Sequence, residues 1–222
     1  MRRNSMRYFM KLVFKSIFTV LITTLLIGSA TELYAQSETP EFDRLKGAFE
    51  DNRVFTAFFS HEYKDSFTGE RQYSEGRIWI GKDRYKIEGQ NQIMVVDGET
   101  STVYDGSKNR VIVSDYIEEE DDFAPSRMLQ GVDETFTVQE ESLPSGEFRV
   151  TLKSDDPFSI FMEVQIYLTS NGEPLRIEAI DQVENVLVTQ FLEGSFIRDE
   201  QNEMFTMEIP EDAEFIDLRQ GS

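Results

Sequence analysis

Side chains alternate with a period of two residues over most of the chain, and this alternation constrains the fold more than any other feature. From Val54 onward, apolar and polar positions take turns, as in β-strands whose two faces meet different surroundings. Pairs that tolerate positive φ favour tight hairpins between the strands; they are Asp97-Gly98, Asp105-Gly106 and Asn171-Gly172. The sequence therefore predicts about ten antiparallel strands, the last over Met204–Ile209 before Pro210.

Two short helices are expected beside the strands. Pro40 can start the first, which has one apolar stripe at spacings of three and four residues; the stripe is Phe42, Leu45 and Phe49. The second is expected within Phe123–Leu129, with Pro125 in its first turn. Five consecutive acidic residues, Glu118–Asp122, precede it, so this insertion predicts a loop that leads to a flap.

The first 35 residues have the pattern of a secretory signal. Five basic residues precede the apolar run Ile17–Ile27, and Leu33-Tyr34-Ala35 supplies a small residue at the end. The run is too short for a membrane span, which needs about 20 residues. We expect cleavage after Ala35, with Ala30 as the alternative site and an uncleaved anchor as a second alternative. Residues 36–222 would then form a single exported domain.

Cysteine usage and charge limit the partners of this domain. The chain has no cysteine, so it can form no disulfide and carry no lipid on a cysteine. After the leader is removed, 17 basic and 41 acidic residues leave a net charge of −24. Such a chain repels phosphate backbones, so we expect no nucleic-acid partner. Two explanations of the acidity remain open: solubility in high salt, or a surface for basic partners.

The residues of common catalytic and metal sites are mostly missing. No cysteine nucleophile and no Gly-x-Ser-x-Gly motif exist, and the single histidine, His61, has no second histidine for a metal pair. The acidic run lacks the ligand spacing of a calcium loop. Gly76–Asp83 has the spacing of a phosphate loop, but Asp83 replaces the Ser or Thr that would hold Mg²⁺. We therefore expect no enzyme activity, no metal and no cofactor.

A family resemblance is carried by segments that follow one another along the chain. They are Gly76–Lys82 with Trp79 at its centre, Arg84–Glu88, Val95–Thr100, Val103–Asp105, Pro125 with Met128-Leu129, and Phe205–Pro210. In this order they resemble the periplasmic outer-membrane lipoprotein carriers of the LolA family. The resemblance extends over essentially all of residues 36–222.

The resemblance implies a fold and a function. The fold is mainly β (α+β): an open half-barrel of about ten or eleven antiparallel strands, with short lid helices over its concave face. The function is that of a monomeric periplasmic carrier, which takes acylated lipoproteins from an inner-membrane transporter and passes them to an outer-membrane acceptor. The alternative is a sensor or binding domain of the same fold, which binds a partner protein or free lipid in envelope signalling.

Alternation and the resemblance together predict the residues of an acyl-chain cavity. One strand parity is expected to face inward, because charged residues occupy the other, and the apolar residues of the two helices would cover it. The expected cavity and lid residues are Leu45, Phe49, Ile78, Ile80, Tyr85, Ile87, Met94, Val96, Met128 and Leu129. The resemblance also implies that Lys82 latches the lid by donating to backbone carbonyls near Phe123–Leu129, with Arg84 as the next candidate.

Overall fold

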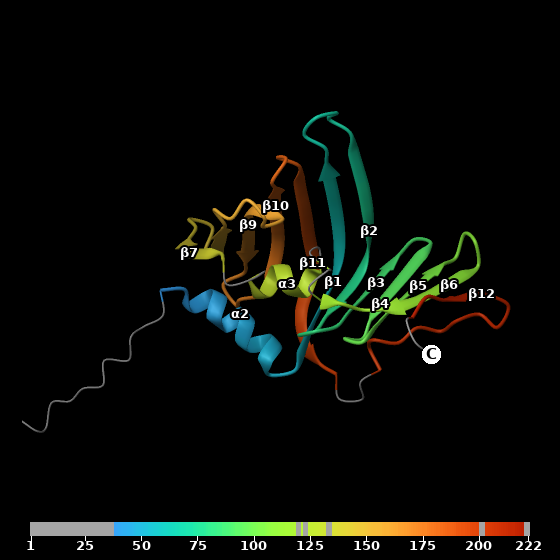
Figure 1. Cartoon of the computed structure of the whole chain (residues 1–222). Helices are drawn as coiled ribbons and strands as arrows, with labels where there is room; N and C mark the ends of the chain where they lie inside the picture. Colours follow the sequence, from blue (N-terminus) through green and yellow to red (C-terminus); the bar gives the residue numbers. More distant parts are fainter. Residues whose placement is uncertain (1–37, 119–120, 122–123, 132–134, 200–202, 220–222) are drawn as a thin grey trace, which may run out of the picture. The chain divides into compact units, whose positions relative to one another are not determined.

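The described strands form a single open sheet with two helices on one face (Figure 1). The computed structural model describes residues 38–118, 121, 124–131, 135–199 and 203–219, which belong to one compact unit of the chain. The predicted leader, Phe123 and most of the acidic run lie outside these residues. None of the helices in the described part is long and apolar enough to cross a membrane.

The sheet has twelve strands in the order β12-β6-β5-β4-β3-β2-β1-β11-β10-β9-β8-β7. In chain order they are β1 Arg53–Lys64, β2 Arg71–Ile80, β3 Tyr85–Gly89, β4 Gln92–Val96, β5 Thr100–Asp105, β6 Arg110–Asp115, β7 Thr137–Ser142, β8 Phe148–Lys153, β9 Phe161–Leu168, β10 Pro174–Asp181, β11 Val186–Arg198 and β12 Glu214–Asp217. β7 and β12 are the two edges of the sheet. The predicted open, mainly antiparallel sheet is confirmed, with one strand more than the upper expected number.

The end of the chain corrects the prediction in two ways. Met204–Ile209 is not a strand, and the last strand, β12, instead pairs with β6 in parallel. Phe205 is buried against Val54 and Val95, on the face of the sheet opposite the helices. Met204, Phe205 and Met207 of this segment therefore pack onto a face of the sheet, which needs no pairing with a sheet edge.

The first strand is buried on both faces near its start. Val54, Phe55, Thr56 and Ala57 are all buried. Val54 packs into the cluster with Phe205, whereas Phe55 lies in the main core beneath the helices. β1 therefore joins the two apolar layers of the domain.

The first helix, α2 (Pro40–Glu50), begins at the predicted proline and buries the predicted stripe. The side chain of Thr39, which precedes the helix, makes no capping hydrogen bond. Instead, the Glu140 carboxylate of β7 accepts from the backbone N–H groups of Glu41 and Phe42, at 2.9 and 3.0 Å. A carboxylate is favourable there because these N–H groups lack helical acceptors and the helix dipole is positive at this end. Glu140 thus fixes the start of α2 to the β7 edge.

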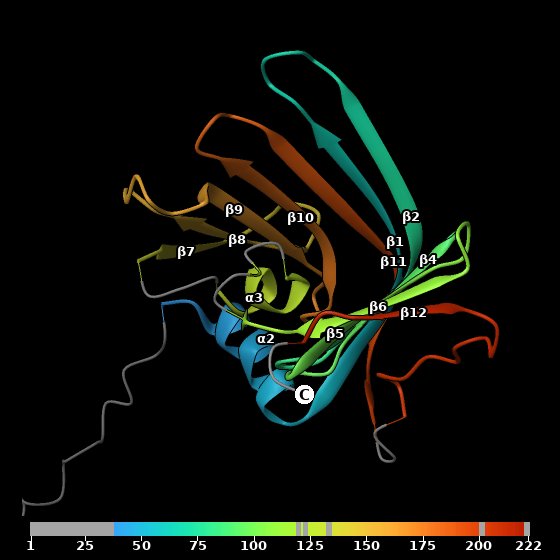
Figure 2. The same cartoon turned by 45° about the vertical axis from the view of Figure 1, so that its right-hand side comes forward.

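The second helix, α3 (Pro125–Gln130), has proline in its first turn and ends at Gly131, whose φ of 111° favours glycine. Met128 and Leu129 are buried in the same core cluster as the apolar side chains of α2. Figures 1 and 2 show both helices against one face of the sheet, with the β1–β2 hairpin extending beyond α3. The helices therefore cover only part of this face.

Candidate functional site

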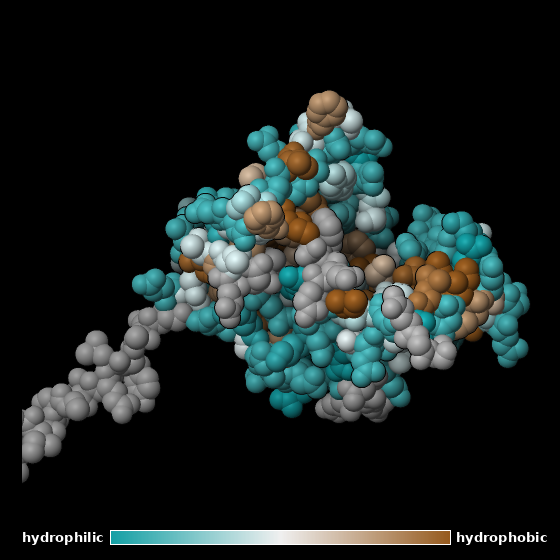
Figure 3. Space-filling model, in the orientation of Figure 1, coloured by the Kyte–Doolittle hydropathy of each residue, from teal (hydrophilic) through white to brown (hydrophobic). Residues whose placement is uncertain are grey.

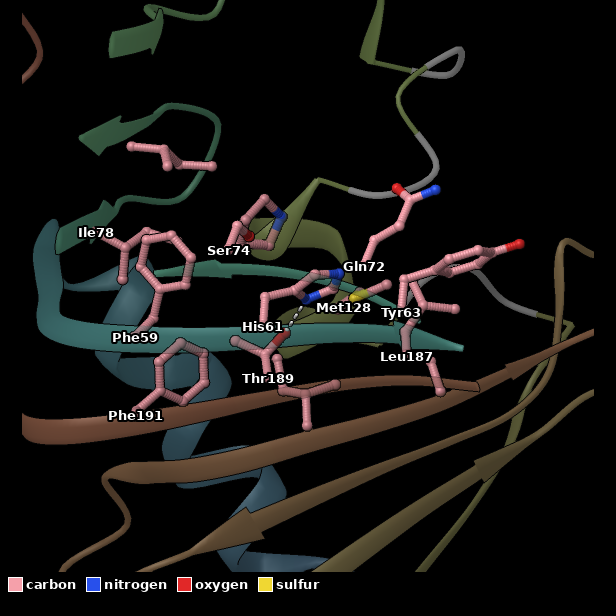
Figure 4. Close-up of a pocket in the computed structure, with 14 residues that line it drawn as sticks. Phe59, His61, Tyr63, Gln72, Ser74, Ile78, Met128, Leu187, Thr189 and Phe191 are labelled. Carbon is pink, nitrogen blue, oxygen red and sulfur yellow. Dashed lines mark hydrogen bonds between the residues drawn. The ribbon is translucent and has the colours of Figure 1, made fainter. Parts of the chain in front are cut away.

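A pocket of about 570 Å³ lies between α3 and the face of the sheet beneath the helices. This volume is within the range of about 300 to 1,000 Å³ that is common for small-molecule sites. Its lining comes from β1, β2, β3, β10, β11 and α3, and the residues are Phe59, His61, Tyr63, Gln72, Ser74, Ile78, Ile87, Pro125, Met128, Ile177, Ala179, Leu187, Thr189 and Phe191. Figure 4 shows the Phe59 and Phe191 rings side by side, with Tyr63 and Gln72 toward the other end.

Strand register explains why these residues share one wall. Phe59 pairs with Phe191 of β11 on one side and with Gly76 of β2 on the other. Since directly paired residues point to the same face, every second residue of β1 from Phe55 to Tyr63 faces this side. Phe55 and Ala57 of this row are buried in the main core, and the pocket lies along Phe59, His61 and Tyr63.

The charge of the lining is unlike that of the chain as a whole. Among the described residues, the pocket is lined by no Asp, Glu, Lys or Arg, although such residues make up 29% of the sequence. Its polar groups are one imidazole, hydroxyl groups and one amide. An apolar molecule, or one with uncharged polar groups, can therefore enter without leaving an ion unpaired.

Three of the ten predicted cavity residues, Ile78, Ile87 and Met128, line this pocket. Four others lie in the main core beneath the helices: Leu45, Phe49, Ile80 and Leu129. The remaining three form part of a small neighbouring cluster with Ala124: Tyr85, Met94 and Val96. The structure thus places all ten on one side of the sheet, and their role toward a ligand stays a prediction.

The apolar face continues beyond the pocket. Ile87 pairs with Met94, which pairs with Val103, and the row ends with Ile112 and Ile216. These side chains are partly buried. Figure 3 shows two brown groups in a mostly teal surface, one below the β1–β2 hairpin and one over β5, β6 and β12. An elongated apolar molecule would therefore find further apolar surface beside the pocket.

The Lys82 side chain makes a different contact from the one expected. Its Nζ lies 2.7 Å from Glu50 Oε2 at the end of α2, in an exposed ion pair. The lid contact runs through the Lys82 backbone carbonyl, which accepts from Gln130 Nε2 at 2.7 Å. The short distance from this turn to α2 explains the change, because it brings Glu50 within reach of the ammonium group.

Arg127 and Arg84 hold neighbouring segments. Arg127 donates from α3 to the carbonyls of Glu118 and Asp121, at 3.1 and 3.3 Å, and so ties the acidic loop to the lid helix. The Arg84 guanidinium lies 4.6 Å from the centre of the Phe205 ring and 3.9 Å from the Asp199 carboxylate. Arg84 therefore fastens the C-terminal segment to the opposite face, away from the pocket.

Two tyrosines beside α3 share the Asp121 carboxylate. Tyr85 Oη donates to Asp121 Oδ2 at 2.7 Å. Burial raises the pKa of Tyr85, and the hydrogen bond to Asp121 raises it further. Burial and Asp121 likewise raise the pKa of Tyr116. Both phenols therefore stay neutral at physiological pH and hold Asp121 against the sheet.

His61 lies in this pocket, although it was not among the predicted cavity residues. Its Nδ1 lies 2.8 Å from Thr189 Oγ1 (Figure 4). Burial lowers the pKa of His61 from its ordinary value of 6.5, so the ring is neutral near pH 7. The alternation in β1 could have found it, because His61 has the parity of Phe55 and Phe59. No group of three or more His, Cys, Asp or Glu in the described part of the chain could hold a metal ion.

This domain is thus an open β-sheet whose helix-bearing face contains an uncharged pocket. No protein-family model matches the chain, and no curated protein matches it. Among solved structures, an uncharacterized conserved protein from Thermus thermophilus is similar at a TM-score of 0.52 and 14% identity, over 82% of this chain and 99% of that one.

Two further structures have names that relate to the family that the sequence motifs resemble. A LolA superfamily protein from Nitrosomonas europaea matches at a TM-score of 0.42 and 12% identity, over 78% of this chain and 99% of that one. A putative outer membrane lipoprotein-sorting protein domain from Vibrio parahaemolyticus matches at 0.40 and 11%, over 75% and 95%. The structural neighbours thus include a LolA superfamily protein. At 14% identity the Thermus thermophilus structure speaks for the fold alone, and the comparisons assign no function.

Proposed function

We propose that the protein is an exported carrier, which binds the acyl chains of lipoproteins and moves them through the periplasm from the inner to the outer membrane. The observation that carries this proposal is the uncharged, largely apolar pocket beside α3, in a chain that is otherwise rich in charge. Acyl chains gain free energy from such a surface in proportion to the apolar area removed from water.

The sequence supports the location and the class of cargo. A leader with the pattern of a secretory signal precedes the domain, and the ordered motifs around Trp79 resemble those of lipoprotein carriers. An inner-membrane transporter that loads the carrier and an outer-membrane acceptor that unloads it belong to this proposal. So do a cleaved leader and a monomeric state in solution.

Capture of a lipoprotein tests the proposal directly. The purified chain from Gln36 is mixed with a triacylated lipoprotein in detergent, the detergent is removed, and the products are separated by gel filtration. We expect the acylated lipoprotein to elute in a soluble complex and its non-acylated counterpart to elute alone. If both forms elute alone, lipoprotein carriage is wrong; if a free acyl lipid in a parallel mixture is nevertheless retained, the signalling or lipid-binding alternative is favoured.

Two substitutions locate the binding surface. Met128→Asp places a carboxylate in the pocket wall and should abolish capture, because an unpaired buried charge is costly. Leu192→Asp is the matched control, since Leu192 is 62% exposed and its β1 partner, Phe58, has the outward parity. Both variants should retain the β-sheet circular dichroism spectrum. Equal capture by the two variants would remove the pocket from the mechanism.

A further inference from the structure

Three adjacent strands place a polar layer across the pocket at one level. Ser74 of β2, His61 of β1 and Thr189 of β11 are directly paired in the sheet register, and all three line the pocket. Two residues deeper along β1 lies the apolar layer with Phe59 and Phe191, at a distance of about 7 Å along the strand. The pocket thus has an apolar floor and a polar layer nearer its open side.

The polar layer has hydrogen-bonding capacity that faces the pocket. The contact between His61 Nδ1 and Thr189 Oγ1 occupies one nitrogen of the ring. Within the described residues, neither His61 Nε2 nor the Ser74 hydroxyl has a protein partner. When Thr189 donates to Nδ1, the ring proton is on Nε2, which can then donate to an acceptor in the pocket. The N–H group at His61 Nε2 and the Ser74 hydroxyl are then two donors at one level, and together they can bind a carbonyl oxygen.

The absence of charge from the lining described above limits what this carbonyl can be. A carboxylate at this level would meet no cationic side chain of the described residues, and an unpaired ion in a largely apolar pocket is strongly disfavoured. An ester or amide carbonyl accepts the same hydrogen bonds and brings no charge. The layer therefore selects a neutral acyl linkage over a free fatty acid.

We propose that Ser74, His61 and Thr189 form a subsite for the ester or amide linkage of a neutral acyl lipid, with the acyl chain directed toward Phe59 and Phe191. This subsite rests on the proposed function, because it gives the orientation and the chemical class of the acyl ligand. It predicts that the carrier distinguishes ligands by the group at the end of the chain as well as by chain length.

Displacement of the uncharged fluorescent probe N-phenyl-1-naphthylamine tests the subsite at pH 7.5. The competitors share a 12-carbon chain: methyl dodecanoate, dodecanoate and dodecane. We expect the methyl ester to bind most tightly. In the variant with both His61→Phe and Thr189→Val, its affinity should fall about fivefold, as expected for one lost hydrogen bond, while the affinity for dodecane should not fall. Thr151→Val is the control, because Thr151 of β8 has the opposite parity to the buried Val150 and Leu152.

The outcomes separate the subsite from the carrier function. If the three competitors bind equally to the unchanged protein, or if the double variant loses affinity for dodecane and ester alike, the subsite is wrong although acyl binding stands. If dodecanoate binds most tightly, the selection against charge is wrong. If none of the three displaces the probe, acyl binding itself fails, and the proposed function fails with it.

Discussion

Gly76 should tolerate no side chain, whereas its partner on the neighbouring strand should accept one. The two residues are Gly76 of β2 and Gly89 of β3, which lie directly opposite each other. A Cβ added at Gly76 would lie 2.0 Å from the Glu88 carbonyl oxygen, while a Cβ at Gly89 would have its nearest contact at 3.6 Å. Optimal contacts between nonbonded heavy atoms are at about 3.5 to 4.0 Å. In Gly76→Ala the β3 backbone would therefore have to retreat by more than about 1 Å.

The expected magnitudes follow from this difference. Overpacking of a filled site costs about 1 to 3 kcal/mol. Replacing glycine by alanine without strain stabilises by about 0.4 to 1 kcal/mol, because the unfolded chain loses freedom. Since backbone has to move, we expect Gly76→Ala to lower the free energy of unfolding by about 2 kcal/mol. Gly89→Ala should raise it by about 0.5 kcal/mol.

Thermal unfolding followed by circular dichroism measures the contrast. For a domain of 150 to 250 residues, 1 kcal/mol shifts Tm by about 2 to 4 °C, so the two variants should differ by about 5 to 10 °C. Both are glycine-to-alanine changes in one strand pair, and this cancels most effects on the unfolded state. Equal Tm values for the two variants, or a lower Tm for Gly89→Ala than for Gly76→Ala, would refute the close approach of β2 and β3 at this point.

Three further predictions concern single ionisable side chains and the net charge of the domain. Glu140→Ala should lower the free energy of unfolding by about 1 kcal/mol, because two N–H groups of α2 lose their acceptor. Urea titration checks this value. The control is Glu141→Ala, which removes only the ion pair with Arg149 and should change the free energy of unfolding little. Because folding lowers the pKa of His61 from 6.5, the contribution of His61 to stability is complete above pH 6.5 and is lost as the pH falls below 6.5. Between pH 7 and pH 5, Tm should therefore fall more in the unchanged protein than in His61→Gln. If the net charge of −24 reflects adaptation to high salt, Tm should rise steeply with NaCl as self-repulsion is screened; a flat response would favour a basic partner instead.

Local patterns predicted most of the fold because each depended on nearby residues. The stripe Phe42, Leu45 and Phe49 and the proline at the start of α2 are read within one helix, and the inward parity of Ile78 and Ile87 is read within one strand pair. The prediction of a strand over Met204–Ile209 was wrong, because alternation also occurs in extended segments that pack onto a face of the sheet. Only the position of the distant Val54 and Val95 decides between these two cases.

The candidate site was harder to predict because the same physics selects core residues and ligand-binding residues. Leu45 and Ile80 are apolar and face inward, yet α2 and the sheet already bury them. The short helix α3 contributes Pro125 and Met128 to the pocket, while its end at Gly131 lies beside Phe42 and Leu152 of the core, so the position of this helix determines which part of the row is covered. Lys82 shows the same limit, since the sequence indicated a basic residue near the lid but not that Glu50 would bind it.

The partial cover of this face is also what a carrier requires. Burying one methylene is worth about 0.8 kcal/mol, so two fully enclosed acyl chains of roughly 16 carbons would gain about 26 kcal/mol, beyond the practical limit of about 20. Cargo held so tightly would not leave at a useful rate. A pocket that opens past α3 toward the exposed Ser74 and Gln72 encloses a chain only in part. Part of the acyl surface then stays available to an acceptor, and release needs no unfolding of the core in which α2 and α3 are anchored.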